Sequence, residues 1–241
     1  MDSGVSAATN GLTAYLRAQE VLAHNLANVN TPGFRRRMAV FHSFDEALAQ
    51  AQGESESPVD VVVDFRHGPM RETGNPLDLT LGADGFFVLG ADEGYLYTRK
   101  GNFSLSADGA VVDSLGRPLI GRGGARLRVP ADAREIRVDP SGEVFADNTS
   151  VGRVWVVEPV DTAQLVPAPY TAFSLPETAP PPTTVREPDL VQGAIEGSNT
   201  DPVEEMVNMI ATLRSFEAAQ RVLRSMSDTT EQMATAASRP A

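Results

Sequence analysis

The chain has no cysteine, only three histidines and no long apolar run, and each of these absences excludes a class of chemistry. Without cysteine there is no disulfide framework, thiolate nucleophile, iron–sulfur cluster or cysteine-bound zinc. No stretch approaches the roughly 18 apolar residues that a membrane span needs, so we expect no membrane insertion. The first residues carry no basic segment followed by an apolar one, which predicts that no secretory signal is cleaved.

Basic residues are outnumbered by acidic ones. The chain has 20 lysines and arginines and 32 aspartates and glutamates, so its formal net charge is -12. Proteins that bind duplex nucleic acid take much of their affinity from lysines and arginines that neutralise phosphates. The charge therefore argues against nucleic-acid binding. The one basic run, Arg35-Arg36-Arg37, is interpreted as a solvated surface.

Motifs for catalysis are missing as well. His24, His42 and His67 lie in different contexts and form no H-E-x-x-H pattern. There is no G-x-S-x-G elbow, and the glycines at 121–124 lack the strand-then-helix context of a phosphate loop. We predict no catalytic residue, cofactor, metal site or small-molecule substrate. A hydrolase that uses carboxylates remains an alternative, and it would require convergent carboxylates with perturbed pKa values.

The first 34 residues predict a helix and its stop. Pro32 disfavours helical geometry at Thr31, and Gly33 admits a positive φ, so the helix should end at this cluster. The positions of one face of the expected helix recur at alternating spacings of three and four, and the polar Gln19 stands at one of them, between Tyr15 and Leu22. The apolar residues of this face are Val5, Ala8, Leu12, Tyr15, Leu22, Leu26 and Val29.

The middle of the chain, residues 77–165, predicts a compact all-β domain of antiparallel strands. Asp108-Gly109 between two apolar runs is a strong hairpin signal. Short apolar or alternating runs predict further strands, at 77–81, 85–89, 95–98, 118–120, 126–129, 135–138, 143–146 and 153–158.

Two segments flank this domain. Residues 35–76 are expected to form an extended connector, with a short helix at 41–52 and a strand at 59–65. Residues 166–198 hold seven of the 17 prolines and are expected to be an extended return linker without regular hydrogen bonds.

A second helix is expected within 199–241. Asp201 suits the N-cap, Pro202 suits the first turn, and Glu204 and Glu205 favour the positive end of the helix dipole. The phase of its apolar stripe slips by one residue after Leu213. The stripe consists of Val203, Met206, Ile210, Leu213, Phe216, Ala219, Leu223 and Met226.

The terminal helices should depend on packing, because isolated helices are marginal in water. A helix of about 30 residues is about 45 Å long, which is longer than a small domain is wide. The partner is the other terminal helix, a neighbouring copy of the chain, or both. The alternative is that both helices lie along one face of a single α+β domain.

The segment Asn25-Leu26-Ala27-Asn28-Val29-Asn30-Thr31-Pro32-Gly33-Phe34 resembles the N-terminal signature of the bacterial flagellar rod and hook protein family, whose pattern is N-L-A-N-x-x-T-x-G-F. Two further regions resemble the same family. They are the C-terminal blocks Gly193, Glu196-Gly197-Ser198-Asn199, Glu204-Glu205, Met209-Ile210, Arg214 and Phe216-Glu217, and the β-domain blocks Gly85-Phe86-Phe87, Tyr97-Thr98-Arg99 and Gly101-Asn102-Phe103.

The resemblance implies an α+β fold with a central all-β domain of antiparallel strands, in which the N- and C-terminal helices pair with each other as a coiled coil that lines the inner tube, with the β domain outside. It implies a structural subunit of the basal-body rod, in the periplasm, that transmits torque from motor to hook. Its implied partners are further copies, neighbouring rod subunits and the flagellar type III export apparatus. Within the family the chain is most similar to proximal rod subunits, and distal rod subunits are the alternative. A cytosolic coiled-coil adaptor is a further alternative.

The resemblance and the helix stripes together name the residues expected to carry assembly. They are Leu12, Leu22, Asn25, Leu26, Asn28, Thr31, Pro32, Gly33, Phe34, Ser198, Asn199, Met206, Ile210, Leu213, Phe216 and Leu223.

Overall fold

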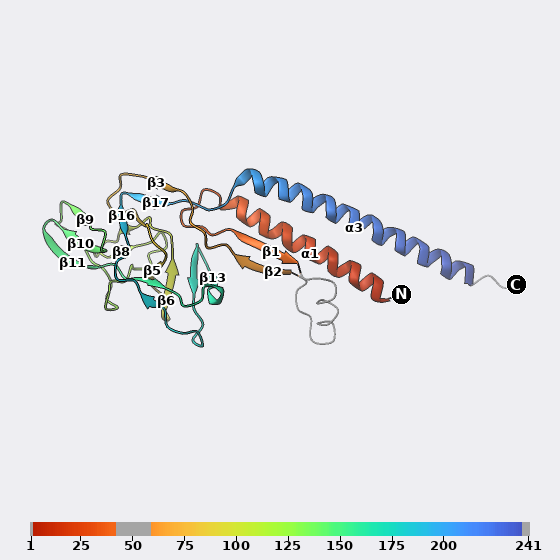
Figure 1. Cartoon of the computed structure of the whole chain (residues 1–241), viewed down its shortest axis with the longest axis horizontal. Coiled ribbons are helices and arrows are strands. Elements are labelled where there is room, and N and C mark those ends of the chain that lie inside the picture. Colours follow the sequence, from red (N-terminus) through yellow and green to blue (C-terminus); the bar gives the residue numbers. More distant parts are fainter. Residues whose placement is uncertain (1, 42–58, 238–241) are drawn as a thin grey trace. The chain divides into compact units, whose positions relative to one another are not determined.

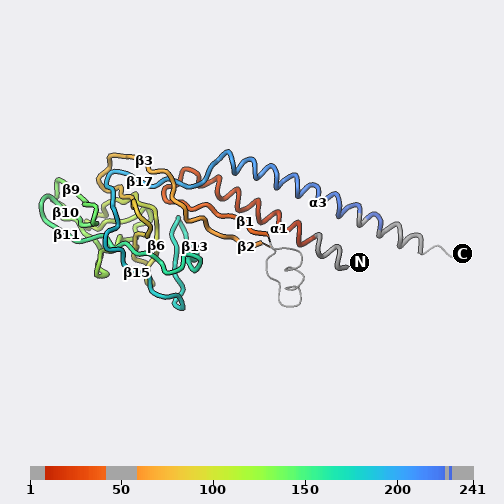
Figure 2. Tube along the Cα trace, in the orientation of Figure 1, coloured from red at the N-terminus to blue at the C-terminus, as the bar shows by residue number. Residues whose placement is uncertain are grey.

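The computed structural model describes residues 2–41 and 59–237, and the chain divides into two compact units (Figure 1). The helical unit is drawn from 1–27, 36–64 and 200–241, and the β unit is drawn from 28–35 and 65–199. The colours of the Cα trace in Figure 2 show that the helical unit combines both ends of the sequence. The predicted α+β class is confirmed.

The helical unit contains α1 (Asp2–Ala27), α3 (Pro202–Ala237) and a hairpin of β1 (Arg37–Phe41) and β2 (Val59–Val63). α1 packs against α3 and also against the hairpin (Figure 1). The strands are antiparallel, and Met38 pairs with Val62. None of the described helices is long and apolar enough to cross a membrane.

Both helix ends follow local chemistry. α1 ends at Ala27, and the turn that follows leads to the expected stop at Pro32-Gly33. At the start of α3, Oδ1 of Asp201 accepts hydrogen bonds from the backbone N–H of Val203 at 2.8 Å and of Glu204 at 3.3 Å. These bonds satisfy donors that the first turn leaves without helical partners, so the predicted N-cap is confirmed.

The buried face of α1 is made of small residues. The exposed fraction is 5% for Ala14, 3% for Ala18 and 6% for Val21, and Asn25 continues this face at the spacing of one helix side. Leucines dominate the predicted stripe, but Leu12, Leu22 and Leu26 are only half-buried. Small side chains allow neighbouring elements to approach closely, which explains why this face lies innermost.

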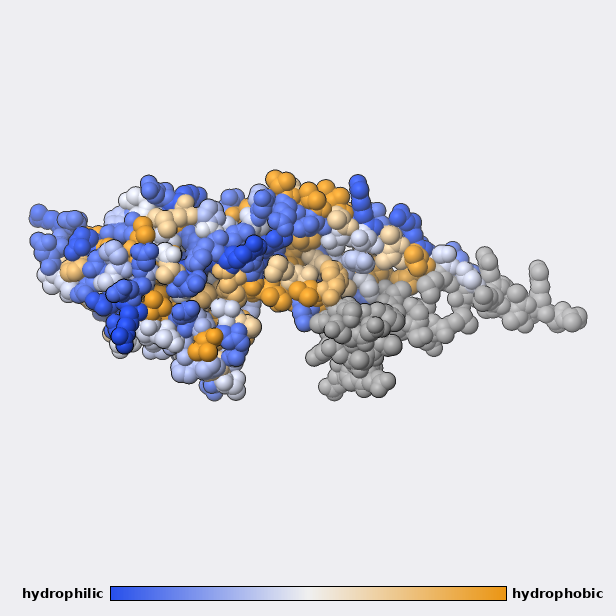
Figure 3. Space-filling model, in the orientation of Figure 1, coloured by the Kyte–Doolittle hydropathy of each residue, from blue (hydrophilic) through white to orange (hydrophobic). Residues whose placement is uncertain are grey.

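The stripe on α3 changes sides along the helix. Its first part points to solvent together with the neighbouring Val207, which is 60% exposed. The stripe residues in this part, which are 42% to 64% exposed, are Val203, Met206, Ile210 and Leu213. Figure 3 shows the corresponding apolar surface over the first turns of α3. Phe216, Ala219 and Leu223 are half-buried instead. The phase slip in the sequence therefore marks the point where the stripe passes from the outward side toward the packed side.

The β unit is built on a six-stranded antiparallel sheet with the order β13-β14-β6-β5-β12-β15. Its strands are β5 (Phe86–Gly90), β6 (Tyr95–Thr98), β12 (Val156–Glu158), β13 (Val166–Ala168), β14 (Ala172–Ser174) and β15 (Thr183–Thr184). A three-stranded sheet adds β9 (Ile136–Val138), β10 (Glu143–Ala146) and β11 (Thr149–Arg153). A short 3-10 helix spans Thr162–Gln164.

Three antiparallel strand pairs complete the unit, and they are β16 with β4, β17 with β3 and β7 with β8. Their bounds are β3 (Met70–Glu72), β4 (Leu79–Leu81), β7 (Ser104–Leu105), β8 (Val111–Val112), β16 (Leu190–Gln192) and β17 (Ala194–Glu196). β7 and β8 form the hairpin predicted around Asp108-Gly109. The core side chains that are at most 1% exposed include Phe87, Leu89, Leu119 and Val156.

The flanking segments differ from their expected form. Residues 36–64 belong to the helical unit and 65–76 to the β unit, so 35–76 is not one connector. The return segment 166–198 carries five strands, so the expected lack of regular hydrogen bonds is wrong. These strands pair partly with residues more than a hundred positions away, which no local pattern reveals. The short helix expected at 41–52 lies outside the described residues, except that Phe41 ends β1.

Candidate assembly site

The family-like segment 25–34 divides between the two units. Asn25 belongs to the helical unit, whereas Asn28, Thr31 and Phe34 belong to the β unit. Each part makes long-range contacts within its own unit.

Asn25 joins three elements of the helical unit. Its Nδ2 donates to the backbone oxygen of Arg37 at 2.7 Å and to Oε2 of Glu205 at 3.2 Å. In return the N–H of Arg37 donates to Oδ1 of Asn25 at 2.9 Å. Asn25 and Glu205 are both fully buried, so their polar atoms depend on these partners. One amide therefore connects the end of α1, the start of β1 and the first turn of α3.

Arg36 compensates the buried charge at the same place. Its Nε lies 2.5 Å from Oε1 of Glu205, and its Nη2 lies 2.8 Å from Oε1 of Glu204. A buried carboxylate is very costly unless it is paired, and this arginine supplies the positive charge. Arg36 is largely buried and Arg35 almost completely, so the interpretation of 35–37 as a solvated surface is wrong.

In the β unit, the loop at 28–35 is attached to β17. The N–H of Gly33 donates to the backbone oxygen of Glu196 at 2.8 Å, and Phe34 is buried. Gly33 has φ +67, and a Cβ at this position would overlap the backbone of Arg99 and Lys100. Only glycine suits both the conformation and the close approach.

A buried ion cluster secures the same loop. Nη2 of Arg35 lies 2.8 Å from Oε1 of Glu196, and both side chains are at most 4% exposed. Nη1 of Arg99 lies 3.6 Å from Oε2 of Glu196, and the N–H of Gly68 donates to Oε1 at 2.9 Å. Burial lowers the pKa of Arg99 to about 10, and the nearby Glu196 opposes that shift.

His67 and Asp84 lie at the exposed edge of this cluster. Nε2 of His67 lies 2.9 Å from Oδ1 of Asp84, and its Nδ1 lies 3.4 Å from Oε1 of Glu196. The cluster is a network of mutually compensating charges that fastens the loop to β17. Among the described residues, no group of three His, Asp or Glu side chains is placed to hold a metal ion.

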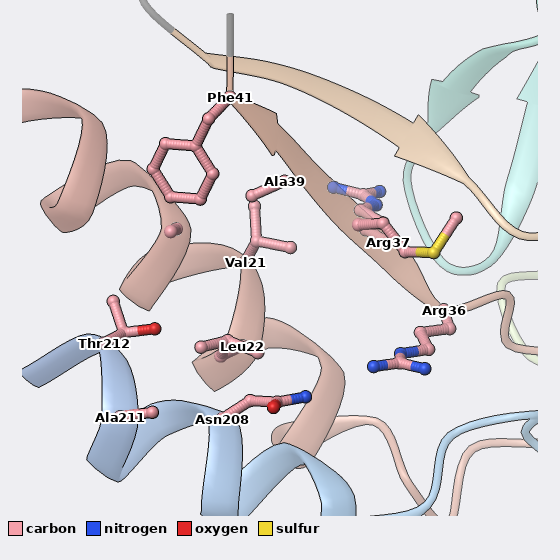
Figure 4. A pocket seen from close by; sticks show the side chains of 11 residues that line it. Val21, Leu22, Arg36, Arg37, Ala39, Phe41, Asn208, Ala211 and Thr212 are labelled. Atoms are coloured by element: carbon pink, nitrogen blue, oxygen red, sulfur yellow. The ribbon is translucent and has the colours of Figure 1, made fainter. Parts of the chain in front are cut away.

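A groove of about 250 Å³ lies in the helical unit, between α1, β1 and α3 (Figure 4). Val21, Leu22 and Ala39 supply apolar walls, and Asn208 from α3 supplies a polar one. Arg36 also lines the groove, but it already binds Glu204 and Glu205. Arg37 and Thr212 add further polar groups, so the lining is mixed in character.

The remaining predicted residues occupy supporting places. Nδ2 of Asn199 donates to the backbone oxygen of Arg66 at 2.9 Å, Ser198 is buried, and Oγ1 of Thr31 donates to Oδ1 of Asn28 at 3.2 Å. Pro32 is half-buried.

Sequence reasoning missed the acidic and basic partners that complete the site. Glu196 and Glu205 fell within the family-like C-terminal blocks, but no local pattern pairs them with residues more than 150 positions away.

Three family profiles match the chain. "Flagella basal body rod protein" covers residues 6–35, "Flagellar hook protein FlgE/F/G D1 domain" covers 81–146, and "Flagellar basal body rod FlgEFG protein C-terminal" covers 191–236. The first includes the segment with Asn25 and Gly33, and the third includes Glu196 and Glu205.

Full-length relatives agree with these matches. The flagellar basal-body rod protein FlgF of Salmonella typhimurium is 31% identical over 243 residues, with 95% of each chain covered. FlgF of Caulobacter vibrioides is 29% identical over 92% of this chain and 93% of its own. The rod protein FlgG of Agrobacterium fabrum is 29% identical over 90% of this chain and 92% of its own. The chain therefore belongs to the family of flagellar basal-body rod proteins.

Proposed function

We propose that this chain is a structural subunit of the flagellar basal-body rod and that its helical unit carries the contacts between subunits. The observation that carries the proposal is the buried bond network of Asn25, Arg36 and Glu205, which joins the two ends of the sequence into one unit. The rod family is structural, so the chain is not an enzyme. Its partners are other rod components of the basal body.

The finer assignments are also part of the proposal. α1 and α3 pair as a coiled coil in the inner tube of the rod, and the β unit lies toward the outside. The assembly residues are those named from the sequence, with Asn25 and Gly33 holding the local geometry and Met206, Ile210 and Leu213 meeting neighbours. The mutual packing of α1 and α3 and the exposed start of α3 support this arrangement.

We place the chain in the proximal part of the rod, with a distal position as the alternative. Similarity to the FlgF proteins at full length supports the proximal position, and similarity to a FlgG protein keeps the distal one open. We further propose that the chain reaches the periplasm through the flagellar type III apparatus, without loss of a signal peptide.

Basal bodies purified from the bacterium that makes this protein test the proposal. The chain should co-purify with the rod, and its deletion should leave basal bodies that lack both the distal rod and the hook. Basal bodies that retain the distal rod without this chain would contradict the proximal position. Absence of the chain from purified rods would contradict the function itself.

A further inference from the structure

We propose that the β unit carries a binding groove for a glycan of N-acetylated amino sugars. The groove has a volume of about 630 Å³ and lies where the β5–β6 hairpin meets the turn at 115–118 and the segment 120–126. Small-molecule sites have volumes of roughly 300–1,000 Å³. The choice of ligand rests on the proposed function in one respect, the periplasmic location, where the bacterial cell wall is a polymer of such sugars.

The floor of the groove is apolar. Ile120 is only 4% exposed, and Leu96 and Pro118 are half-buried beside it. Gly90 permits this packing, because a Cβ on it would lie 3.1 Å from the side chains of both Ile120 and Pro118. A recess of this kind suits the methyl of an acetamido group, which gains free energy when it leaves water.

Tyr95 forms an aromatic wall that is held in place before any ligand binds. It is 40% exposed, and its ring meets the ring of Trp155 edge-on, with 5.2 Å between the centroids. The indole N–H of Trp155 donates to Oγ1 of Thr184 at 3.0 Å, which fixes the indole in turn. A sugar ring presents a flat C–H face that packs on an aromatic ring, and a ring already fixed loses little entropy when it does so.

Polar side chains border the apolar floor. Arg126 and Asp92 line the groove and are exposed. Within the described ranges 2–41 and 59–237, neither side chain has a hydrogen bond or an ion pair. A guanidinium supplies several donors and a carboxylate several acceptors, so together they match the hydroxyls and the amide of an amino sugar.

The charges of the lining are balanced, which favours a neutral sugar. Arg117 is the third charged residue of the lining, and its Nε donates to Oδ2 of Asp113 at 2.7 Å. Arg126 and Asp92 carry opposite charges and offset each other. A phosphate polymer would require an excess of basic groups, which this lining does not provide.

A protein partner is the other occupant to consider. The exposed large apolar side chains of the lining are Tyr95 and Leu115. A stable protein interface buries roughly 800 Å² on each partner around a well-packed apolar centre. Two such side chains are few for that purpose, whereas one ring and one apolar recess are sufficient for a sugar.

Trp155 can report on the groove, because it is the sole tryptophan and contacts Tyr95. Titration of the full-length chain with the tetramer of N-acetylglucosamine should change its fluorescence with saturation. Cellotetraose has the same linkage but no acetamido groups, so it should bind about tenfold more weakly or less, since it leaves the apolar recess unfilled. No saturable binding of the tetramer, or equal binding of cellotetraose, would overturn the proposal.

Substitutions at Tyr95 locate the binding. Isothermal titration calorimetry should show about tenfold weaker binding of the tetramer to Tyr95→Ala, because the wall is lost. Tyr95→Phe keeps the ring and should stay within about twofold. Tyr170→Ala is the matched control, because Tyr170 is 63% exposed in the same unit and does not line the groove. Equal losses from Tyr95→Ala and Tyr170→Ala would contradict the site.

A second pair of variants tests the polar border. Arg126→Ala should weaken binding of the tetramer about tenfold, because a hydrogen-bonding guanidinium is removed. Arg134→Ala removes an exposed arginine outside the lining and should leave the affinity unchanged. If Arg126→Ala binds as tightly as the unmodified chain, the border has no part in recognition and the proposal fails.

Co-sedimentation with purified cell-wall sacculi extends the test to the polymer. The unmodified chain should sediment with the sacculi, excess tetramer should release it, and Tyr95→Ala should stay in solution. Sedimentation that the tetramer does not compete would overturn the proposal. So would groove variants that keep full affinity for the tetramer but lose another protein from purified basal bodies. A chain that binds the tetramer but is absent from purified rods would contradict the proposed function alone.

Discussion

At the scale of residues, the structure depends on a few polar side chains that are buried far from water. Asn25 and Glu205 are completely buried, and Arg35 and Glu196 are nearly so. A buried polar group without a hydrogen-bond partner lowers the stability of the fold. A paired one favours a single arrangement of the chain, because other arrangements leave it without its partner. The family-like segment thus acts through two sets of contacts, one in each unit.

The buried Arg35–Glu196 pair gives a direct prediction. Arg35→Ala leaves Glu196 with the more distant Arg99, so the β unit should lose about 3–5 kcal/mol of unfolding free energy. Arg128→Ala removes an exposed pair with Asp108 and should change stability little. Denaturant titration followed by the fluorescence of Trp155 measures both. Equal, small effects would show that the buried cluster does not hold the loop.

At the scale of elements, α1 shows that the size of its side chains decides which face is innermost. Ala14, Ala18 and Val21 face the packed side and are at most 6% exposed, whereas Leu12, Leu22 and Leu26 of the predicted stripe are only half-buried. Hydrophobicity alone favours the leucine stripe as the buried one. Close approach between helix and neighbours instead requires small groups, since well-packed interiors leave little free space.

A matched pair of substitutions tests this interpretation. Ala14→Leu should destabilise the helical unit by about 1–3 kcal/mol, because Ala14 is buried on the small face and a leucine overfills a close contact. Ala23→Leu makes the same change at an exposed position of the same helix and should stay within about 0.5 kcal/mol. Thermal unfolding followed by far-ultraviolet circular dichroism distinguishes them. A tolerated Ala14→Leu would mean that the packing at this face is loose.

At the scale of the whole molecule, the chain forms two units with separate interiors. The β unit has a continuous apolar core around Phe87 and Leu89. The helical unit relies on the small face of α1 and on the polar network of Asn25. Both ends of the sequence enter the helical unit, so its formation requires the complete chain.

Separate interiors predict separate responses to mutation. Asn25→Ala should lower the unfolding free energy of the helical unit, followed by circular dichroism of the helices, by about 2–4 kcal/mol. It removes the hydrogen bonds to the buried backbone of Arg37 and to Glu205, which keeps only its ion pair with Arg36. The transition reported by Trp155, the sole tryptophan, should not move. Its indole N–H donates to Thr184 within the β unit. A parallel shift of both transitions would show that the two units unfold as one.

Local chemistry accounts for the features that could be predicted from the sequence. Asp201-Pro202 marked the start of α3, Pro32-Gly33 the stop after α1, and Asp108-Gly109 the hairpin of β7 and β8. Each depends on neighbours a few residues apart, so a short segment contains all the information needed. The assignment to a structural rod family followed from the segment at 25–34, where residue order alone is distinctive.

Pairings between distant residues could not be predicted in this way. The β1–β2 hairpin, the contact of Arg35 with Glu196 and the contact of Asn25 with Glu205 join segments whose separations no local pattern encodes.

The absence of cysteine, the negative charge and the lack of catalytic motifs were determined by the sequence itself. Only the tertiary structure decided which apolar residues are covered. Met206 and Ile210 have the same spacing as core residues but remain exposed, because α1 packs against the other side of α3. Whether an apolar side chain is buried depends on which element packs against its side of the helix, and only the folded chain determines that element.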